Sequence, residues 1–246
     1  MKALILAGGK GTRFMEETVV KPKPMIEICN KPILFHIIDH YSFFGVEEFI
    51  ILAGYKIEYI VDYFKKQNLK YKDGVFLTYK NLKIRVLDTG DETMTGGRIK
   101  RASKFINEKF FLTYGDGLAN VNLESLKEFH NLKNTLATVT AVRPPARFGS
   151  LTIKDSKVIE FGEKHQSKEG WINGGFFVLS KQVIDLIEDD SVAFEQFPLE
   201  SLARSGNLSA YKHEGFWYPV DTLREKLILE KYVEDNNGLI PWANDQ

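Results

Sequence analysis

The chain contains 246 residues, 33 of them Lys or Arg and 33 Asp or Glu, so its formal net charge is zero, and 43% of its residues are hydrophobic. This hydrophobic content, with 18 Phe and 10 Tyr, excludes a disordered chain, and the length suits one large α/β domain or two small ones. The balanced charge argues against a broad basic surface for nucleic acid or an anionic membrane.

The distribution of apolar residues and cysteine bears on the compartment. No apolar run approaches the roughly 18 to 20 residues that a membrane helix needs. The first apolar stretch is short and runs directly into a glycine-rich loop, which is typical of a buried strand and not of a secretory signal. Cys29 is the only cysteine, which excludes a disulfide framework and favours a reducing cytoplasm. We therefore expect a cytoplasmic protein with no nucleic-acid or membrane partner.

The first half of the chain predicts alternating strands and helices. A continuous apolar run at 3–7 is typical of a strand buried on both faces. Helical spacing of apolar residues predicts a helix over 32–44 that Gly45 ends, and a strand follows over 48–53. Strand, helix and strand in this order favour parallel pairing through a right-handed crossover. The pattern continues with a short helix at 57–66 and strands at 84–87, 110–113 and 135–142.

The pattern changes after the prolines at 144–145, but no linker, repeat or low-complexity segment interrupts the chain. It predicts a hairpin over 151–161, a strand over 171–179, a helix over 181–187 and a last helix from about 222 to 233. We therefore expect one α/β domain over 1–246, with a Rossmann-like, mostly parallel mixed sheet flanked by helices. The second half is expected to cover the strand ends.

A glycine-rich loop leaves the first predicted strand at 8–11, and the basic segment Lys-Pro-Lys-Pro follows at 21–24. Three glycines let backbone N–H groups approach phosphate oxygens, and Arg13, Lys21 and Lys23 add cationic donors. The combination predicts a polyphosphate site. A tight turn with solvated lysines is the less favoured interpretation.

The spacing of this loop excludes two familiar phosphate-binding loops. A dinucleotide fingerprint needs a small residue where Phe14 stands. A Walker loop needs Ser or Thr directly after its lysine, whereas Lys10 precedes Gly11.

Two aspartates come directly after predicted strand or loop segments. Asp116 follows the strand at 110–113, at the carboxyl end of the sheet, where α/β folds bind their ligands. Asp221 precedes the last helix. Each has a structural alternative, since Asp116 suits a turn and Asp221 suits a helix N-cap. Together they supply two of the hard oxygen ligands that Mg²⁺ takes.

These residues resemble the sugar-phosphate nucleotidyltransferases, from Met1 to Trp242 and in the same order. Besides the loop at 8–13, the resemblance rests on Lys-Pro-Lys-Pro-Met at 21–25, Gly-Asp-Gly at 115–117, Glu-Lys at 163–164, Asn-Gly-Gly at 173–175 and Asp-Thr at 221–222. More narrowly, the chain is similar to the glucose-1-phosphate cytidylyltransferases of that family at 16–18, 88–90, 94–98, 143–149, 215–217 and 241–242.

The resemblance implies that a substrate phosphate oxygen attacks the α-phosphorus of CTP and expels pyrophosphate. The chain would then be a homo-oligomeric cytidylyltransferase that makes a CDP-linked molecule from a sugar 1-phosphate such as glucose 1-phosphate, for capsule or other polysaccharide synthesis. Residues up to about 142 would bind CTP, and the remainder would bind the acceptor and complete the metal site.

The resemblance also implies a role for individual residues. Arg13 is the expected catalytic residue at the leaving pyrophosphate and Lys23 the one at the α-phosphate. Asp116 and Asp221 are the expected ligands of Mg²⁺. The implied nucleotide site comprises Leu6, Ala7, Gly8, Gly9, Gly11, Thr12, Arg13, Lys23, Thr95, Gly96, Arg98 and Asp116, with 95, 96 and 98 near the base. The implied acceptor site comprises Gly149, Glu163, Lys164, Asn173 and Gly174.

Two departures from the family pattern fall where acceptor or subunit contacts are expected. The stretch between 63 and 88 is about ten residues shorter than in the glucose 1-phosphate enzymes. His165 stands where the family has proline after Glu-Lys. One alternative is therefore a CTP:phosphoglutamine-type cytidylyltransferase, which acts on a non-sugar phosphate in capsule phosphoramidate synthesis. An alternative of another class is a non-catalytic, nucleotide-binding regulatory subunit.

Overall fold

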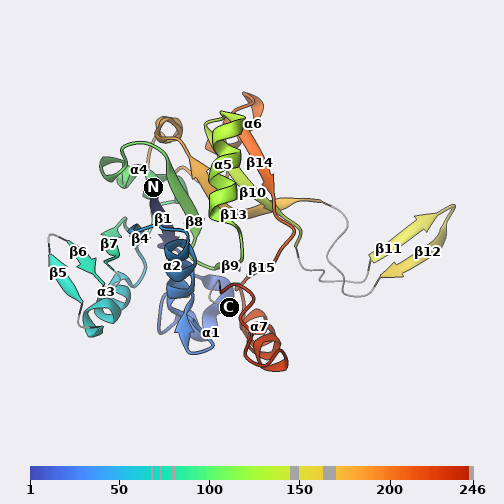
Figure 1. The fold of residues 1–246 in the computed structure, drawn as a ribbon, viewed down its shortest axis with the longest axis horizontal. Coiled ribbons are helices and arrows are strands. Elements are labelled where there is room, and N and C mark those ends of the chain that lie inside the picture. The colour runs from blue at the N-terminus through green and yellow to red at the C-terminus, as the bar shows by residue number, and fades with distance from the viewer. Residues whose placement is uncertain (68, 73, 79–80, 145–149, 163–169, 244–246) are drawn as a thin grey trace.

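The computed structural model describes residues 1–67, 69–72, 74–78, 81–144, 150–162 and 170–243. In this part of the chain, helices cover both faces of a nine-stranded mixed sheet (Figure 1). Its strands, in spatial order, are β14 (Leu208–Lys212), β10 (Ala137–Val142), β13 (Ile172–Leu179), β8 (Phe110–Tyr114), β1 (Lys2–Ala7), β4 (Glu48–Ala53), β7 (Lys83–Asp88), β6 (Val75–Leu77) and β5 (Lys70–Lys72).

Short strand pairs and helices complete the architecture. The pairs are β2 (Glu27–Ile28) with β3 (Lys31–Pro32), β9 (Gly117–Ala119) with β15 (Trp217–Pro219), and β11 (Ser150–Lys154) with β12 (Lys157–Gly162). The α-helices are α1 (Met15–Thr18), α2 (Ile33–Phe43), α3 (Ile57–Lys66), α4 (Thr95–Arg101), α5 (Leu123–Lys133), α6 (Phe197–Arg204) and α7 (Leu223–Asp235). The 3₁₀ helices are η1 (Thr12–Phe14), η2 (Lys23–Met25), η3 (Ser103–Phe105) and η4 (Lys181–Leu186).

The centre of the sheet is parallel, as predicted. β1 pairs in parallel with β4 on one side and β8 on the other, and β4 pairs in parallel with β7. β13 is antiparallel to both of its neighbours, β8 and β10. The loops that follow β1, β4, β7 and β8 therefore meet at one edge of the sheet, which is where α/β folds bind ligands. The predicted fold class, an α/β protein with a mostly parallel mixed sheet, is confirmed.

Both faces of β1 are buried, which explains its unbroken apolar sequence. Ala3, Ile5 and Ala7 belong to one hydrophobic cluster, and Leu4 and Leu6 belong to the other. The first cluster lies beneath α2, α3, α5 and α7, and the second lies beneath α4, α6 and η4. The sheet is therefore the middle of three layers.

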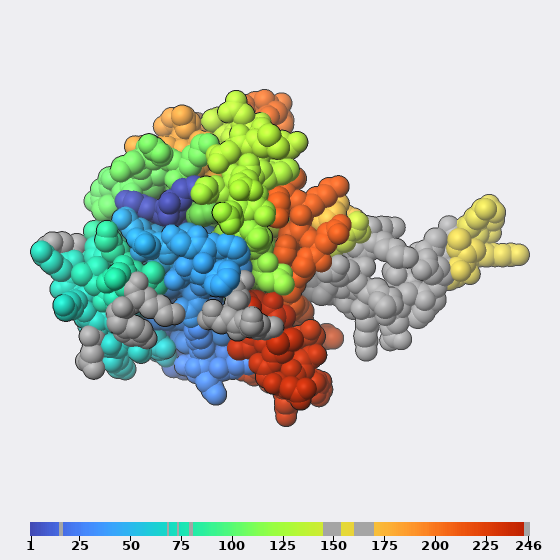
Figure 2. Space-filling view, in the orientation of Figure 1, coloured from blue at the N-terminus to red at the C-terminus, as the bar shows by residue number. Residues whose placement is uncertain are grey.

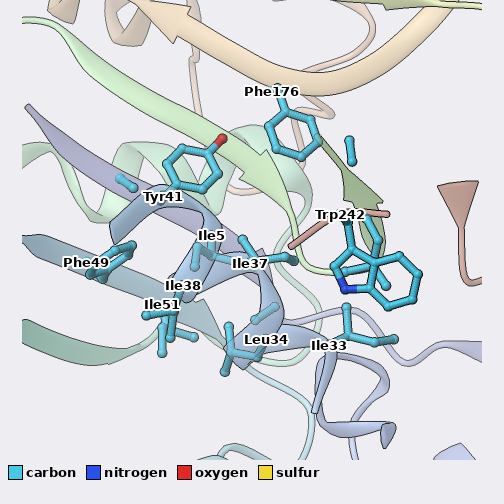
Figure 3. Close-up of a cluster of buried hydrophobic side chains, with 14 of the residues drawn as sticks. Ile5, Ile33, Leu34, Ile37, Ile38, Tyr41, Phe49, Ile51, Phe176 and Trp242 are labelled. Carbon is cyan, nitrogen blue, oxygen red and sulfur yellow. The ribbon is translucent and has the colours of Figure 1, made fainter. Parts of the chain in front are cut away.

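Helix α2 supplies much of the first cluster (Figure 3). Its buried apolar side chains recur at the spacing of one helical face and include Ile33, Leu34, Ile37, Ile38 and Tyr41. Each fully buried side chain of this size stabilises the fold by about 1.5–3 kcal/mol. Gly45 follows the helix with φ +75°, a left-handed conformation that stops the helix where the sequence predicts.

The end of the described chain closes this face of the sheet. Trp242 is 2% exposed, and its ring lies 5.5 Å from that of His36 and 5.6 Å from that of Phe216. The Trp242 ring thus connects α2 with the segment before β15, and Figure 3 shows it beside Ile33.

Some elements differ from the sequence-based predictions. The segment predicted as a helix at 181–187 forms the 3₁₀ helix η4 and not an α-helix. Helices α5 and α6 and the short strands β9 and β15 have no counterpart among the predicted elements. The hairpin predicted at 151–161 is present as β11 and β12, which lie apart from the central sheet (Figures 1 and 2).

Candidate active site

A cleft of about 340 Å³ opens at the carboxyl edge of the parallel strands. It is lined by Leu6, Ala7, Gly8, Gly9, Gly11, Thr12, Arg13, Lys23, Pro24, Thr93, Met94, Thr95, Arg98, Tyr114, Gly115, Asp116 and Asp221. Every residue of the implied nucleotide and metal sites is in this set except Gly96, which is buried behind it. The cleft thus gathers segments that lie more than 200 residues apart in the chain.

The glycine-rich loop forms one wall of the cleft, directly after β1. Gly11 has φ +59°, a left-handed conformation that favours glycine. A Cβ atom at Gly8 would lie 2.0 Å from Nη1 of Arg98, so a larger residue there would displace the buried Arg98 side chain. The loop continues into η1, which contains Arg13. The side chain of Arg13 is 74% exposed. The backbone N–H groups of this loop are therefore free to approach a ligand closely.

Lys23 connects the two predicted metal ligands. Its Nζ lies 2.5 Å from Oδ2 of Asp116 and 2.5 Å from Oδ1 of Asp221. Arg13 adds a third contact, at 3.0 Å from Oδ2 of Asp221. Lys23 is only 8% exposed, and burial lowers its pKa, but the two carboxylates outweigh burial and raise the pKa above its ordinary value. The site therefore holds a protonated lysine between two carboxylates.

Short strand pairing brings these aspartates together. Asp116 follows β8 in the turn before β9, and β9 pairs with β15, so that Pro219 lies opposite Gly117. The N–H of Val220 donates to the carbonyl of Asp116 at 2.8 Å. Asp116 is thus a turn residue, and its side chain also lines the cleft.

Asp221 does not cap the last helix. The N-cap of α7 is Thr222, whose side chain accepts from the N–H of Glu225. The Glu225 carboxylate in turn accepts from the N–H of Asp221 at 2.7 Å. This reciprocal arrangement caps the helix without using the Asp221 side chain, which stays directed at Lys23 and Arg13.

Arg98 lies beneath the glycine-rich loop and holds the strand ends together. It is 4% exposed. Its two terminal amino groups donate to five oxygens at the carboxyl ends of β1, β4 and β7. They are the carbonyls of Gly8, Ala53, Gly90 and Asp91 and the hydroxyl of Thr89. The structure therefore gives Arg98 a positioning role, whereas the resemblance places it near the base.

Replacing Arg98 by alanine is expected to lower the free energy of unfolding by about 2–4 kcal/mol, because several buried carbonyls lose their donors. Urea denaturation measures this change. Arg101→Ala is the matched control, since Arg101 lies one turn further along α4 and its side chain is 44% exposed in a surface pair with Asp190. That variant should lose less than about 1 kcal/mol. Equal losses in the two variants would contradict the positioning role.

The implied acceptor residues are only partly described. Asn173 donates from Nδ2 to the hydroxyl of Tyr114 at 3.1 Å, and the carbonyl of Gly174 accepts from Nε1 of Trp217 at 2.7 Å. Asn173 therefore lies next to the cleft through Tyr114, and Gly174 follows it directly in β13. Gly149, Glu163 and Lys164 lie outside the described residues.

Several lining residues were not singled out from the sequence as site residues. They are Pro24, Thr93, Met94, Tyr114 and Gly115. Pro24, Met94 and Gly115 lie inside motifs that carry the resemblance, and Thr93 and Tyr114 each directly precede such a motif. Among the described residues, no group of three or more His, Cys, Asp or Glu side chains forms a metal cluster. Every helix in the described ranges is too short or too polar to cross a membrane.

Comparison with known proteins yields consistent matches. The profile of the family described as Nucleotidyl transferase matches residues 2–223. The glucose-1-phosphate cytidylyltransferase of Salmonella typhimurium is 47% identical over 98% of this chain and 98% of its own. A protein of Bacillus subtilis named probable glucose-1-phosphate cytidylyltransferase is 46% identical over 98% of this chain and 99% of its own. The crystal structure of HddC from Yersinia pseudotuberculosis superposes with a TM-score of 0.73 at 28% identity, covering 94% of this chain and 98% of that one.

Proposed function

The chain belongs to the nucleotidyl transferase family, and from this premise we propose that it transfers CMP from CTP to glucose 1-phosphate, giving CDP-glucose and pyrophosphate. The observation that carries the proposal is the 47% identity, over nearly the whole of both chains, to a relative named glucose-1-phosphate cytidylyltransferase. The cleft agrees with it, since one site combines a glycine-rich loop, two cationic side chains and two carboxylates.

The reaction needs charge neutralisation more than it needs an acid or base. A phosphate oxygen of the sugar phosphate forms a bond to the α-phosphorus, and the bond from that phosphorus to the bridging oxygen breaks. Pyrophosphate leaves with the electron pair. The attacking phosphate is already ionised, so no proton has to be removed. Lys23 supports this step by balancing charge at the α-phosphate, and the exposed Arg13 side chain reaches the leaving pyrophosphate.

We propose Mg²⁺ as the metal, held by Asp116 and Asp221. One oxygen of each carboxylate already converges on the ammonium of Lys23, each at 2.5 Å, so these oxygens suit a cation. Two carboxylates are a typical protein contribution to a Mg²⁺ site, whose other ligands are water and substrate phosphate. A bound metal would supply further neutralisation of phosphate charge. With the carboxylates on the metal, the ammonium of Lys23 would be available to phosphate oxygens.

The acceptor site is proposed to lie beyond Tyr114. Asn173 and Gly174 support this placement through their contacts to Tyr114 and Trp217. Gly149, Glu163 and Lys164 are proposed to complete it on the strength of the resemblance. Residues up to about 142 then serve CTP and the remainder serves the acceptor, within one domain.

The cellular setting is proposed on more general grounds. Cys29 is a free cysteine, which suits a reducing cytoplasm. Val19 and Val20 are 66% and 70% exposed, which suits burial in a homo-oligomer. A CDP-linked product suits the synthesis of a capsule or another polysaccharide.

Pyrophosphate release across a panel of acceptors tests the proposed function. With CTP and Mg²⁺, glucose 1-phosphate should support turnover and phosphoglutamine should not. Removing the divalent cation with a chelator should reduce the rate to background, and added Mg²⁺ should restore it. Faster turnover with phosphoglutamine would assign the alternative acceptor, and no turnover with any phosphorylated acceptor would support a regulatory subunit.

A further inference from the structure

The first turn of α4 is joined to the segment at 188–196, which no part of the proposed mechanism uses. The N–H of Met94 donates to the carbonyl of Asp190 at 2.8 Å, and the N–H of Gly96 donates to the carbonyl of Val192 at 2.9 Å. A Cβ atom at Gly96 would lie 2.6 Å from that Val192 carbonyl, so glycine is needed for this close approach. The segment is therefore fixed against the wall of the cleft.

This attachment places the Glu195 carboxylate behind two cleft-lining hydroxyl groups. Oε2 of Glu195 accepts from the Thr95 hydroxyl at 2.6 Å, and Oε1 accepts from the Tyr114 hydroxyl at 2.8 Å. The Thr95 hydroxyl also accepts from the N–H of Phe194 at 2.8 Å. Glu195 itself is half-buried and is not among the residues that line the cleft.

The hydrogen-bonding capacity of the Thr95 hydroxyl is therefore almost used up. A hydroxyl has one proton to donate and two lone pairs. The proton goes to Glu195, and one lone pair accepts from Phe194. An ionised carboxylate has no proton to give, so the direction of the bond to Glu195 cannot reverse. What Thr95 has left for a ligand is one acceptor position.

The second carboxylate oxygen of Glu195 is also an acceptor, and its donor is the hydroxyl of Tyr114. The Tyr114 hydroxyl donates to Oε1 of Glu195 and accepts from Nδ2 of Asn173 at 3.1 Å. Both oxygens of Glu195 are thus held as acceptors by hydroxyl donors.

Thr95 lies at the neutral end of the cleft. The charged lining residues with available side chains, Arg13, Lys23, Asp116 and Asp221, form one contiguous cluster suited to phosphates and a metal. The cleft-lining residues at the start of α4 are Thr93, Met94, Thr95 and Arg98. The first three are uncharged, and the terminal amino groups of Arg98 are occupied by backbone and Thr89 oxygens. A triphosphate at the charged cluster would leave its base near this wall, which is also where the resemblance places residues 95, 96 and 98.

We propose that Glu195 sets the nucleotide preference by fixing the Thr95 hydroxyl as an acceptor for the 4-amino group of cytosine. The inference rests on the proposed use of CTP. Cytosine carries a donor at C4, which the free lone pair of Thr95 accepts. Uracil carries a carbonyl oxygen at C4, and this oxygen would face a lone pair without a proton between them. Glu195 is a positioning residue in this account, because it acts through Thr95.

The ratio of CTP to UTP affinity tests the inference. Dissociation constants for each nucleotide with Mg²⁺ are measured by calorimetry, and kcat/KM is measured with glucose 1-phosphate. In Glu195→Gln the amide supplies a donor, so the Thr95 hydroxyl is free to reverse, and the CTP preference should fall about 10-fold. Thr95→Val removes the acceptor and should produce a similar fall, whereas Thr95→Ser keeps the hydroxyl and should retain the preference.

Glu200→Gln is the matched control, because it makes the same change on the exposed surface of α6, where Glu200 pairs with Arg204. Its CTP preference should equal that of the wild type. An unchanged preference in both Glu195→Gln and Thr95→Val would overturn the inference, as would equal losses for CTP and UTP. If Glu195→Gln unfolds, the comparison of Thr95→Val with Thr95→Ser still tests the inference, because an unchanged preference in Thr95→Val would overturn it. A wild-type protein that does not turn over CTP at all would instead refute the proposed function.

Discussion

Lys23→Ala should abolish measurable turnover, lowering kcat by about 10³-fold or more, while the protein remains folded. The 8% exposed Lys23 contacts both Asp116 and Asp221 through its ammonium group, and among the described residues no second lysine lines the cleft. Preorganised positive charge at a transferring phosphoryl group is worth a factor of this size. Steady-state pyrophosphate release measures kcat, and circular dichroism with thermal unfolding reports whether the fold is retained.

Loss of the ammonium also leaves the two carboxylates facing each other. Asp116 and Asp221 then lose the ammonium group that they share in the cleft. Lys31→Ala is the matched control, because Lys31 forms a surface pair with Asp39 and its side chain is 40% exposed. Near-normal turnover in Lys23→Ala, or an equal loss in Lys31→Ala, would show that the role of Lys23 is wrongly assigned.

Asp116→Asn should have the second large effect, lowering kcat by about 10²–10³-fold at ordinary Mg²⁺ concentration. The substitution keeps the shape of the side chain and removes one of the two negative charges proposed to hold the metal. The Asp116 side chain is 34% exposed, so the change should leave the fold intact. Raising the Mg²⁺ concentration should recover part of the activity, because the loss is one of metal affinity.

A binding measurement separates this effect from a general loss of function. Binding of Mn²⁺ in the presence of CTP, followed by electron paramagnetic resonance, should weaken at least 10-fold in Asp116→Asn. Asp62→Asn serves as the control, since Asp62 pairs with Lys65 on the surface and its side chain is 60% exposed. Unchanged Mn²⁺ affinity in Asp116→Asn would place the metal elsewhere.

The sequence predicts the central elements well because the spacing of apolar residues along a short stretch is enough to indicate which side chains are buried. β1 and β4 are contiguous apolar runs buried on both faces, and α3 turns Ile60 and Phe64 toward the core at helical spacing. The sequence predicts a helix at 181–187 without its type, because a short apolar period does not distinguish a 3₁₀ helix such as η4 from an α-helix. Strands β9 and β15 have three residues each, too few to show any period.

Those two short strands matter most for the site. They pair residues about 100 positions apart, and this pairing places Asp221 beside Asp116. Composition and spacing do not reveal such a contact, and the two aspartates are paired in sequence only by their shared suitability for Mg²⁺ and by the family resemblance. Glu195 was missed for a related reason, because its contacts to Thr95 and Tyr114 span 100 and 81 residues and no local motif marks them.

Arg98 illustrates a difference that only the structure reveals. The resemblance identifies the residue correctly as part of the cleft, but its terminal amino groups are occupied by oxygens at three strand ends. The sequence shows that an arginine stands at position 98 of the motif. Which oxygens its guanidinium contacts depends on the packing of α4 against Gly8 and Gly54, which the sequence does not show.

The most direct test of the central claim follows the α-phosphorus itself. CTP labelled at that atom is incubated with the wild-type protein, Mg²⁺ and glucose 1-phosphate, and the products are separated. The label should appear in CDP-glucose in step with the release of unlabelled pyrophosphate. Label that remains in CTP, or that appears only in CMP, would contradict the proposed transfer to a sugar phosphate.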